Sequence, residues 1–326
     1  MVRYQKQAVG HRSKSERVKE RKRIGKLGNN MVKEPTLVRY QKALVNFLTW
    51  VFQQCVSVPK EMWDMDPVLG EYIEHLWEEG DGISFGNDTL AGLLHYRPKL
   101  KDFLPYSRKL LKTWNKKELP ARAAPFSIQQ LFLLVKAFLD ASEPEFAIVT
   151  LLMFFLILRT GEANYIKRGD ITFSPDYNSF ILNLGQTKVG SRRGNDESVA
   201  CEIPWLSHVV ASWAKGKLPG DPLCSRGIHR FRKSFSEKLR LLPIDASLPW
   251  KPYSLRRGGA TWFFRKCASL SKTVIYGRWN SPRTCRIYIN EALAVLATYG
   301  SLDADSISQV KATLKLLRAP LELLQH

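Results

Sequence analysis

The stretch Phe146-Ala-Ile-Val-Thr-Leu-Leu-Met-Phe-Phe-Leu-Ile-Leu158, followed at once by Arg159-Thr-Gly-Glu162, decides the fold of this chain. The run of 13 residues is shorter than the ~20 that a membrane-spanning helix needs. It therefore predicts a helix buried in a protein core, which we expect over 143–158. An arginine at the end of such a helix is costly to bury unless it meets an anion. The alternative is a surface arginine, which the dipole favours at a helix C-terminus.

The segments around this helix predict a mainly α-helical protein with a small antiparallel β-sheet, an α+β fold. Apolar residues recur at helical spacing in most of the second half of the chain, and short alternating stretches interrupt them. We expect strands over 171–174, 179–184 and 198–203, with a polar loop over 189–195 between the last two. Further helices are expected over 127–140, 228–242, 254–267, 269–277, 283–298 and 305–324.

The first third of the chain predicts a separate helical bundle. Over 35–114, apolar residues recur at helical spacing, and one stripe is especially clear. The following segment, 115–126, has the proline and charge content of a linker. We therefore expect a basic arm over 1–34, a helical domain over 35–114, a linker over 115–126 and a second domain over 127–326. The clear stripe consists of Leu37, Tyr40, Leu44, Phe47, Leu48 and Val51.

The charge of the chain indicates a polyanionic partner. The 50 Lys and Arg residues exceed the 30 Asp and Glu residues, for a net charge of +20. Such a balance favours nucleic acid first and an acidic membrane second, and solubility alone is the alternative. Residues 1–34 carry a net +8, so this flexible basic arm is expected to touch phosphates, serve as a nuclear address or be merely solvated. The acidic cluster over 61–81 is expected to face away from DNA.

The five cysteines are dispersed and form no CxxC pair, which predicts reduced thiols and no Cys/His metal site. The N-terminus is polar and basic and lacks the apolar segment of a secretory signal. We therefore expect an intracellular protein with no membrane partner.

Three further motifs follow in the second half of the chain. Tyr253-Ser-Leu-Arg256-Arg-Gly-Gly-Ala-Thr261 is followed by Gly277-Arg-Trp279 and by Arg286-Ile-Tyr288. Trp279 lies 23 residues after Arg256, and Tyr288 lies nine residues after Trp279. The two glycines and the alanine would let a helix pack closely and hold the arginine side chain still.

In this order and at these intervals, the motifs resemble the tyrosine recombinases, also called the phage-integrase family. Arg159 with Glu162 matches the first family element, and Lys188 in the expected hairpin matches the second. Arg256, Trp279 and Tyr288 match the last three. The resemblance covers about residues 150–300. The residues in these motifs look more like those of recombinases of eukaryotic mobile elements than like those of bacterial recombinases. The helical bundle over 35–114 resembles the core-binding domain that precedes the family's catalytic domain.

The resemblance implies a DNA strand-transfer enzyme that works without metal or small-molecule cofactor. Tyr288 would attack the phosphorus and form a 3′-phosphotyrosyl link, with Arg159 and Arg256 gripping the non-bridging oxygens. Lys188 would protonate the departing 5′-oxygen. Trp279 would offer its indole N–H, and Glu162 would hold neighbouring groups in place. Double-stranded DNA is the implied partner, bound by a homotetramer, in the nucleus if the source is eukaryotic. The C-terminal helix would dock on a neighbouring protomer, and the alternative is that it packs on its own domain.

One position departs from the family pattern, because Tyr253 stands where histidine is usual. A phenol with a pKa of ~10 is a poor base at neutral pH, although it can hydrogen-bond a phosphate oxygen. His208 and His229 are alternative bases only if folding brings one of them near. Tyr276 and Tyr299 are rival nucleophiles by residue type, but their spacing from Arg256 predicts packing roles. Two other functions stay open: a type IB topoisomerase-like activity, and a catalytically impaired, domesticated DNA-binding protein.

Overall fold

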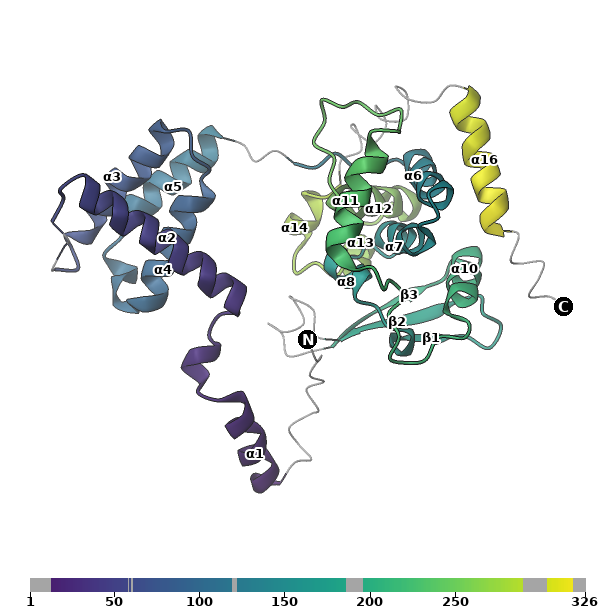
Figure 1. The fold of residues 1–326 in the computed structure, drawn as a ribbon, viewed down its shortest axis with the longest axis horizontal. Helices are drawn as coiled ribbons and strands as arrows, with labels where there is room; N and C mark the ends of the chain where they lie inside the picture. The colour runs from purple at the N-terminus through teal and green to yellow at the C-terminus, as the bar shows by residue number, and fades with distance from the viewer. Residues whose placement is uncertain are drawn as a thin grey trace. The chain divides into compact units, whose positions relative to one another are not determined.

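The computed structural model describes residues 13–57, 59, 61–118, 122–185, 196–289 and 304–318. They form two compact units, one ending at 118 and the other beginning at 122, and each unit has its own hydrophobic core (Figure 1). Helices dominate both units, and the second also contains a three-stranded antiparallel sheet. The predicted fold class is therefore confirmed. None of the helices in these ranges combines the length and the apolar character that a membrane span would need.

The first unit is a helical bundle whose helices pack in two pairs, α2 with α4 and α3 with α5. Its core is rich in aromatic side chains, with Phe47, Trp50 and Tyr72 in mutual ring contact. The helices are α1 (Lys14–Ile24), α2 (Glu34–Gln53), α3 (Met65–Glu78), α4 (Ser84–Tyr96) and α5 (Pro105–Lys117), with short 3-10 turns at Leu27–Asn30 and Pro98–Asp102.

The buried face of α2 differs in part from the predicted stripe. Phe47 and Val51 are buried as expected, but Leu48 is 50% exposed. The fully buried positions are Ala43, Phe47, Trp50 and Val51, which follow one helical face at intervals of three and four. Leu48 belongs to the apolar stripe of the sequence but lies beside the buried face.

Part of the predicted basic arm is helical. Helix α1 begins with a capping box, in which the Glu16 amide donates to Ser13 Oγ (3.2 Å) and the Ser13 amide donates to Glu16 Oε2 (2.8 Å). None of the residues of α1 is buried. Its lysine and arginine side chains are therefore held on a helix without contributing to a core, which composition alone did not predict.

Asp66 holds two helices of the bundle together and is no part of a surface acidic cluster. Its carboxylate is buried and accepts hydrogen bonds from the amides of Tyr106 (2.7 Å) and Ser107 (2.8 Å) and from Ser107 Oγ (2.6 Å). These amides belong to the first turn of α5, where backbone N–H groups lack partners within the helix and an anion is favoured. The carboxylate on α3 thus caps α5, and its assignment to the exposed acidic cluster was wrong.

We expect Asp66→Asn to lower the free energy of unfolding of this unit by about 2 kcal/mol, because hydrogen bonds to a charged acceptor contribute about 1.5–3 kcal/mol. Urea unfolding of the full chain, followed by tryptophan fluorescence, measures the change. The control is Asp64→Asn, since Asp64 is exposed and makes no cap hydrogen bond, and it should change stability by less than about 0.5 kcal/mol. Equal losses in both variants would contradict the capping role.

The predicted linker is divided between the two units. Helix α5 continues to Lys117, into the segment expected to be linker. Ala123, Ala124 and Phe126 are buried in the second unit, where the Ala124 amide donates to the carbonyl of Pro249 (3.1 Å). Residues 122–126 are therefore an edge of the second unit's fold.

The second unit surrounds one long apolar helix with helices and the sheet. The strands run in the order β1-β2-β3, with Phe173 opposite Phe180 and Leu182 opposite Val199. They match the predicted strands to within two residues. The strands are β1 (Ile171–Phe173), β2 (Phe180–Gly185) and β3 (Glu197–Cys201); the helices are α6 (Ile128–Asp140), α7 (Pro144–Phe155), α8 (Thr160–Asn164), α10 (Pro204–Ala214), α11 (Gly227–Leu239), α12 (Tyr253–Cys267), α13 (Leu270–Tyr276), α14 (Pro282–Arg286) and α16 (Ala304–Arg318).

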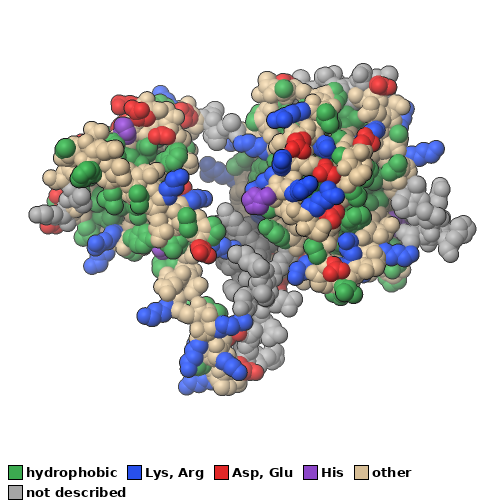
Figure 2. Space-filling view, in the orientation of Figure 1, with side chains coloured by type: hydrophobic (Ala, Val, Ile, Leu, Met, Phe, Trp, Pro, Cys, Tyr) green, Lys and Arg blue, Asp and Glu red, His purple; other side chains and the backbone are tan. Residues whose placement is uncertain are grey.

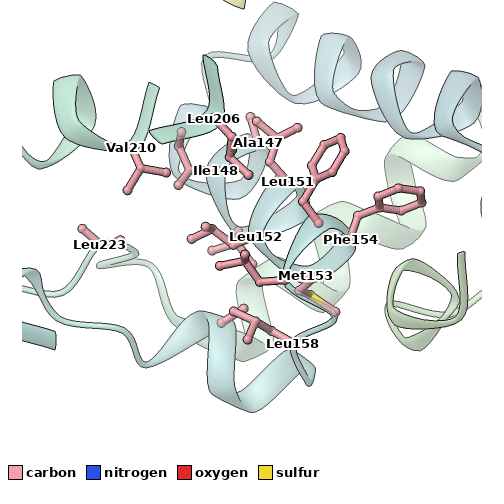
Figure 3. Close-up of a cluster of buried hydrophobic side chains, with 14 of the residues drawn as sticks. Ala147, Ile148, Leu151, Leu152, Met153, Phe154, Leu158, Leu206, Val210 and Leu223 are labelled. Carbon is pink, nitrogen blue, oxygen red and sulfur yellow. The ribbon is translucent and has the colours of Figure 1, made fainter. Parts of the chain in front are cut away.

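Helix α7 is the centre of this core, as the apolar run predicted. Each of its residues from Phe146 to Phe155 is buried, because α6 and α12 pack against it and other elements close the remaining sides. Figure 3 shows its side chains among those of Leu206, Val210 and Leu223. A helix that is apolar all round needs such complete cover.

The end of α7 differs from the prediction, and the difference positions the site described below. The helix ends at Phe155 instead of 158, and Ile157 adopts a left-handed conformation with φ 49°. The Leu158 amide donates to the Met153 carbonyl (3.1 Å) and the Ile157 amide to the Phe154 carbonyl (3.3 Å), the pattern of a Schellman motif. Glycine is usual at the left-handed position, so an isoleucine there hid the helix end from sequence analysis.

Other helix boundaries also required tertiary structure. Helix α10 was not predicted, although Pro204 at its first turn is a typical start. The helix expected over 283–298 ends at Arg286 within the described residues. The C-terminal helix α16 was predicted, and it packs on α6 and α10 of the same chain. Three expectations lie outside the described residues: the polar loop over 189–195, residues 290–298 and the end of the chain beyond 318.

Candidate active site

The carboxylate of Glu162 gathers three arginine side chains. It accepts hydrogen bonds from Arg159 Nη1, through Oε1, and from Arg278 Nη2 (2.8 Å), through Oε2, while Arg256 Nη1 lies 3.9 Å from Oε2. Burial raises the pKa of the Glu162 carboxyl, but the charges of Arg278, Arg159 and Arg256 outweigh it and hold that pKa below its ordinary value. Glu162 is therefore ionised at neutral pH.

Arg159 is placed by the turn that follows α7. It is the N-cap residue of α8, and its amide donates to Glu162 Oε2 (2.8 Å). The expectation that Arg159 closes the apolar helix was therefore wrong, since α7 ends four residues earlier. Its side chain remains 27% exposed, so a ligand can reach it from solvent.

Arg256 is the most deeply buried of the three arginines, with no exposed surface. Its Nη1 donates to the carbonyl of Ile157 and its Nη2 to the carbonyl of Gly277 (2.8 Å). The left-handed turn at Ile157 presents the first of these carbonyls. Burial, together with the charges of Arg159 and Arg278, lowers the pKa of Arg256.

Close packing of α12 on α7 puts Arg256 at this depth. A Cβ atom on Gly259 would lie 1.9 Å from the carbonyl oxygen of Phe154, and one on Gly258 would lie 2.2 Å from that of Phe126. Real Cβ atoms never approach backbone this closely, so only glycine fits at either position. The predicted reason for the glycine pair is confirmed.

Aromatic rings enclose the Tyr288 side chain. The ring of Trp279 lies 4.7 Å from that of Tyr288, and the ring of Tyr253 lies 5.4 Å from it on another side. The Arg256 guanidinium carbon lies 5.0 Å from the Trp279 ring centre and 5.6 Å from that of Tyr288. Tyr288 itself is half-buried. Its phenol is thus held beside the arginine cluster while one side stays accessible.

Two residues that sequence analysis did not single out hold the backbone at Tyr288. Arg257 Nη2 donates to the carbonyl of Ile287 (3.1 Å), and Thr261 Oγ1 lies 3.4 Å from the carbonyl of Tyr288. Both belong to α12, the helix that carries Arg256. The doubled arginine in Leu255-Arg-Arg-Gly-Gly was the available signal, since a second arginine buried on the same helix also needs acceptors.

Buried donors in the cluster lack acceptors. Among the described residues, Arg256 Nε and Trp279 Nε1 have no hydrogen-bond partner. Glu197 Oε2 lies 3.5 Å from Arg278 Nε, so the described part of the cluster, with three arginines, Glu162 and Glu197, has a net charge of +1. Unsatisfied donors with one excess positive charge, next to a phenol, are suited to a singly charged anion such as a phosphodiester.

Three further sequence candidates, Tyr276, His208 and His229, lie among the described residues. The Tyr276 hydroxyl donates to the carbonyl of Phe155 (3.1 Å) and its ring stacks on Phe263, as expected of a packing residue. His208 is hydrogen-bonded to Asn178 (3.2 Å), and His229 is exposed on α11. Lys188 and Tyr299 lie outside the described residues. Within those residues, no group of three or more His, Cys, Asp and Glu side chains is arranged to bind a metal ion.

Comparison with known proteins finds likeness in structure only. The XerH site-specific recombinase bound to its difH substrate aligns with 84% of this chain and 78% of its own, with a TM-score of 0.54 and 13% identity. The lambda integrase dimer bound to a COC′ core site aligns with 85% of this chain and 95% of its own, with a TM-score of 0.56 and 13% identity. The Tn1549 transposon integrase in complex with circular intermediate DNA aligns with 92% and 97%, with a TM-score of 0.57 and 12% identity. No protein-family model and no curated protein matches the chain.

The chain has the tyrosine recombinase fold. Within this fold, six of the seven residues that the family pattern pointed to lie together in one cluster. They are Arg159, Glu162, Tyr253, Arg256, Trp279 and Tyr288. The seventh, Lys188, follows β2, which ends at Gly185.

The tyrosine recombinase fold here carries two features that the family pattern did not predict. Tyr253 occupies the first turn of α12 with its ring on Tyr288, where the pattern has histidine. Arg278 enters the cluster between Gly277 and Trp279, and sequence analysis attached no role to it. The signal for Arg278 was a charged residue next to the matched Trp279, but only the fold reveals that its side chain is buried.

Proposed function

We propose that this chain is a site-specific DNA recombinase or integrase that cleaves and rejoins DNA strands through a 3′-phosphotyrosyl intermediate at Tyr288. The observation that carries the proposal is the Tyr288 phenol beside Arg256 and Trp279, in a cluster with one excess positive charge and unsatisfied donors. The fold supports it, because XerH, lambda integrase and the Tn1549 integrase were each solved on DNA.

In the proposed reaction, Tyr288 Oη forms a bond to the scissile phosphorus while the bond from phosphorus to the 5′-oxygen breaks. The phenolic proton passes to water on the accessible side of Tyr288, and the departing 5′-oxygen gains a proton from Lys188, the proposed donor, which regains one from water. Negative charge grows on the non-bridging oxygens in the transition state. Arg159 and Arg256 would bind these oxygens, since a guanidinium fork is preorganised for such groups. Trp279 Nε1 is a further buried donor for the same phosphate.

Tyr253 is proposed to act as a hydrogen-bond donor in place of the family's histidine. Burial raises the pKa of the Tyr253 phenol, and the neighbouring Tyr288 phenol raises it further. Tyr253 is therefore neutral throughout the range in which a histidine would titrate. It can donate a hydrogen bond to a phosphate oxygen and removes no proton.

We expect Tyr253→His to introduce a pH dependence that the natural chain lacks at this position. A histidine has an ordinary pKa of about 6.5, so the rate of cleavage in this variant should change around pH 6–7. Single-turnover cleavage of a nicked DNA substrate between pH 5.5 and 8.5 measures the profile. An inflection in the natural chain that vanished in Tyr253→Phe would contradict a permanently neutral Tyr253.

The proposed partner is double-stranded DNA. Helix α11 buries Phe231 and Phe235 and leaves a basic face exposed, and lysine and arginine side chains gather over this helix in Figure 2. Such a face suits the phosphate backbone. Its exposed members are Arg226, His229, Arg230, Arg232 and Lys233.

A homotetramer on DNA is proposed as the working assembly. Lambda integrase forms a tetramer on a Holliday junction within this fold. The C-terminal helix remains the proposed connection between protomers, although α16 packs on α6 and α10 in the single chain. Recombination of a mobile element, and a nuclear location in a eukaryotic source, belong to the same proposal.

The experiment that tests this function is covalent trapping. The chain is incubated with DNA from its own genomic flanks that carries a nick next to the candidate cleavage site, so that the cleaved end diffuses away. A protein–DNA adduct on a denaturing gel, with the phosphotyrosine mapped to Tyr288 by mass spectrometry, is expected. Binding without any adduct would favour the alternative of an impaired, domesticated DNA-binding protein. Relaxation of supercoiled DNA by the monomer, without strand exchange, would favour a topoisomerase-like enzyme.

A further inference from the structure

Arg278 occupies an unusual backbone position at the edge of the arginine cluster. It lies between Gly277 and Trp279, just after α13, and has a φ of 57° in the left-handed region. A non-glycine residue is held there only where its surroundings determine the conformation. A Cβ atom on Gly277 would lie 1.8 Å from the ring of Trp279, so the Trp279 ring folds back over this turn. The turn thereby supplies both Trp279 and Arg278 to the site.

The side chain of Arg278 is buried and connects three elements. Only 7% of it is exposed. Its Nη2 donates to Glu162 Oε2 (2.8 Å), its Nε lies 3.5 Å from Glu197 Oε2 at the start of β3, and its Nη1 lies 3.5 Å from the carbonyl of Leu156 after α7. A guanidinium that is this buried must neutralise carboxylates, since an isolated charge would be costly to desolvate.

Arg278 and Arg256 approach the same oxygen of Glu162 but differ in what they do there. Arg278 donates to Oε2 directly, whereas Arg256 Nη1 is 3.9 Å away and donates to the backbone carbonyl of Ile157 instead. The Arg159 side chain uses the other oxygen, Oε1, while the Arg159 amide donates to Oε2 (2.8 Å). Of these three arginines, Arg256 is thus the one that makes no hydrogen bond to a carboxylate.

Removing Arg278 would change this balance in two ways. Glu162 Oε2 would lose its guanidinium donor and keep only the Arg159 amide (2.8 Å), and Arg256 Nη1, 3.9 Å away, would be the cation next to the vacated position. Among the described residues of the cluster, Arg159, Arg256, Glu162 and Glu197 would remain with no net charge, one positive charge fewer than before. Both effects weaken the hold on an incoming phosphate.

We propose that Arg278 is a positioning residue that occupies Glu162 and so keeps the neighbouring Arg256 available to the scissile phosphate. This inference rests on the proposed function, and it assigns a role that the family pattern does not contain. It also explains why an arginine tolerates a left-handed backbone here, since its side chain must reach Glu162 and Glu197 from this one turn.

A double-mutant cycle tests the inference through Glu162. Arg278→Met should slow adduct formation about 100-fold, within the range of coupling between residues in direct contact. Glu162→Gln removes the competing charge, so adding Arg278→Met to it should slow the reaction by less than about threefold. Lys136→Met is the control, because it also removes a cation paired with a carboxylate in this unit, and it should leave the rate unchanged.

Two further variants separate positioning from folding. Arg278→Lys keeps the charge and should react within about tenfold of the natural chain, with its melting temperature measured alongside. If Arg278→Met fails to fold, the variant that combines it with Glu162→Gln is used, because it lacks the buried Glu162 charge that Arg278→Met leaves without its partner. Its rate of adduct formation is then compared with that of Glu162→Gln alone. An equal slowing by Arg278→Met in both backgrounds would overturn the inference, because a merely structural residue is not rescued by removing Glu162.

A readout without chemistry keeps this inference separate from the proposed function. Inorganic phosphate should raise the melting temperature of the natural chain more than that of Arg278→Met. In the double variant with Glu162→Gln, the rise in melting temperature caused by phosphate should return to that of the natural chain. If the natural chain forms no adduct, the proposed function fails and this readout alone decides the role of Arg278. If the adduct forms equally fast with and without Arg278, the inference fails and the proposed function stands.

Discussion

Replacing Tyr288 by phenylalanine is expected to abolish the covalent protein–DNA adduct and to leave DNA affinity within about twofold. The substitution removes only the hydroxyl group, and without it no phosphotyrosyl bond can form. The ring contacts with Trp279 at 4.7 Å and Tyr253 at 5.4 Å do not involve this oxygen, so the local packing should persist. Denaturing gels with the nicked substrate measure the adduct, and binding titrations at fixed salt measure the affinity.

The matched control for this prediction is Tyr276→Phe. Tyr276 lies in the same unit, but its hydroxyl donates to the carbonyl of Phe155 and its ring stacks on Phe263 at 4.3 Å. This variant should lose some stability and still form the adduct. An adduct that survived Tyr288→Phe would place the nucleophile elsewhere, and Tyr299, which lies outside the described residues, would then be tested next.

Gly259→Ala is expected to have the largest effect on stability, with a loss of about 3 kcal/mol or more. The added Cβ would lie 1.9 Å from the carbonyl oxygen of Phe154 and 2.8 Å from its carbon, and these are backbone atoms that cannot rotate away. Helices α7 and α12 would have to move apart, which overpacks one part of the core and opens another. For a unit of this size the loss corresponds to a fall in melting temperature of about 6–12 °C. Differential scanning calorimetry on the full chain measures it.

The same substitution should also impair cleavage, because Arg256 lies three residues before Gly259 on α12 and bonds to the turn that ends α7. The control is Gly161→Ala in α8, where a Cβ would meet no atom within 4 Å. That variant should change stability by less than about 1 kcal/mol. Similar losses in both variants would show that helix propensity, and not the contact of α12 with α7, decides the outcome.

Much of the site could be predicted from sequence because its residues belong to short motifs with regular intervals. Arg256 lies on α12, Trp279 lies in the turn after α13, and Tyr288 follows two residues after the end of α14. Local structure therefore carries most of their placement. The glycine pair after Arg256 predicted a close helix contact, which the structure contains. The apolar run at 146–155 predicted the central helix for the same reason, since only a buried helix is apolar on every side.

What sequence analysis missed depends on contacts between distant segments. Asp66 resembles its acidic neighbours in sequence, and only the approach of α5 makes it a buried cap. In the sequence, Arg278 resembles a surface arginine. Only the fold brings Glu162, 116 residues away, to within 2.8 Å of its side chain. The end of α7 was not predicted because its left-handed residue is an isoleucine. Helix α10 was not predicted because the local sequence showed neither its length nor the elements that pack against it.

The sequence by itself therefore determined the helical framework, the small sheet and the residues from which a phosphate-binding cluster is assembled. These follow from periodicity, turn residues and motif spacing, which act over a few residues to a few turns. Only the tertiary structure decided how charge is distributed among those residues. Glu162 binds Arg159 and Arg278 directly and leaves Arg256 on backbone carbonyls, because burial makes each buried charge depend on the neighbours that folding brings to it.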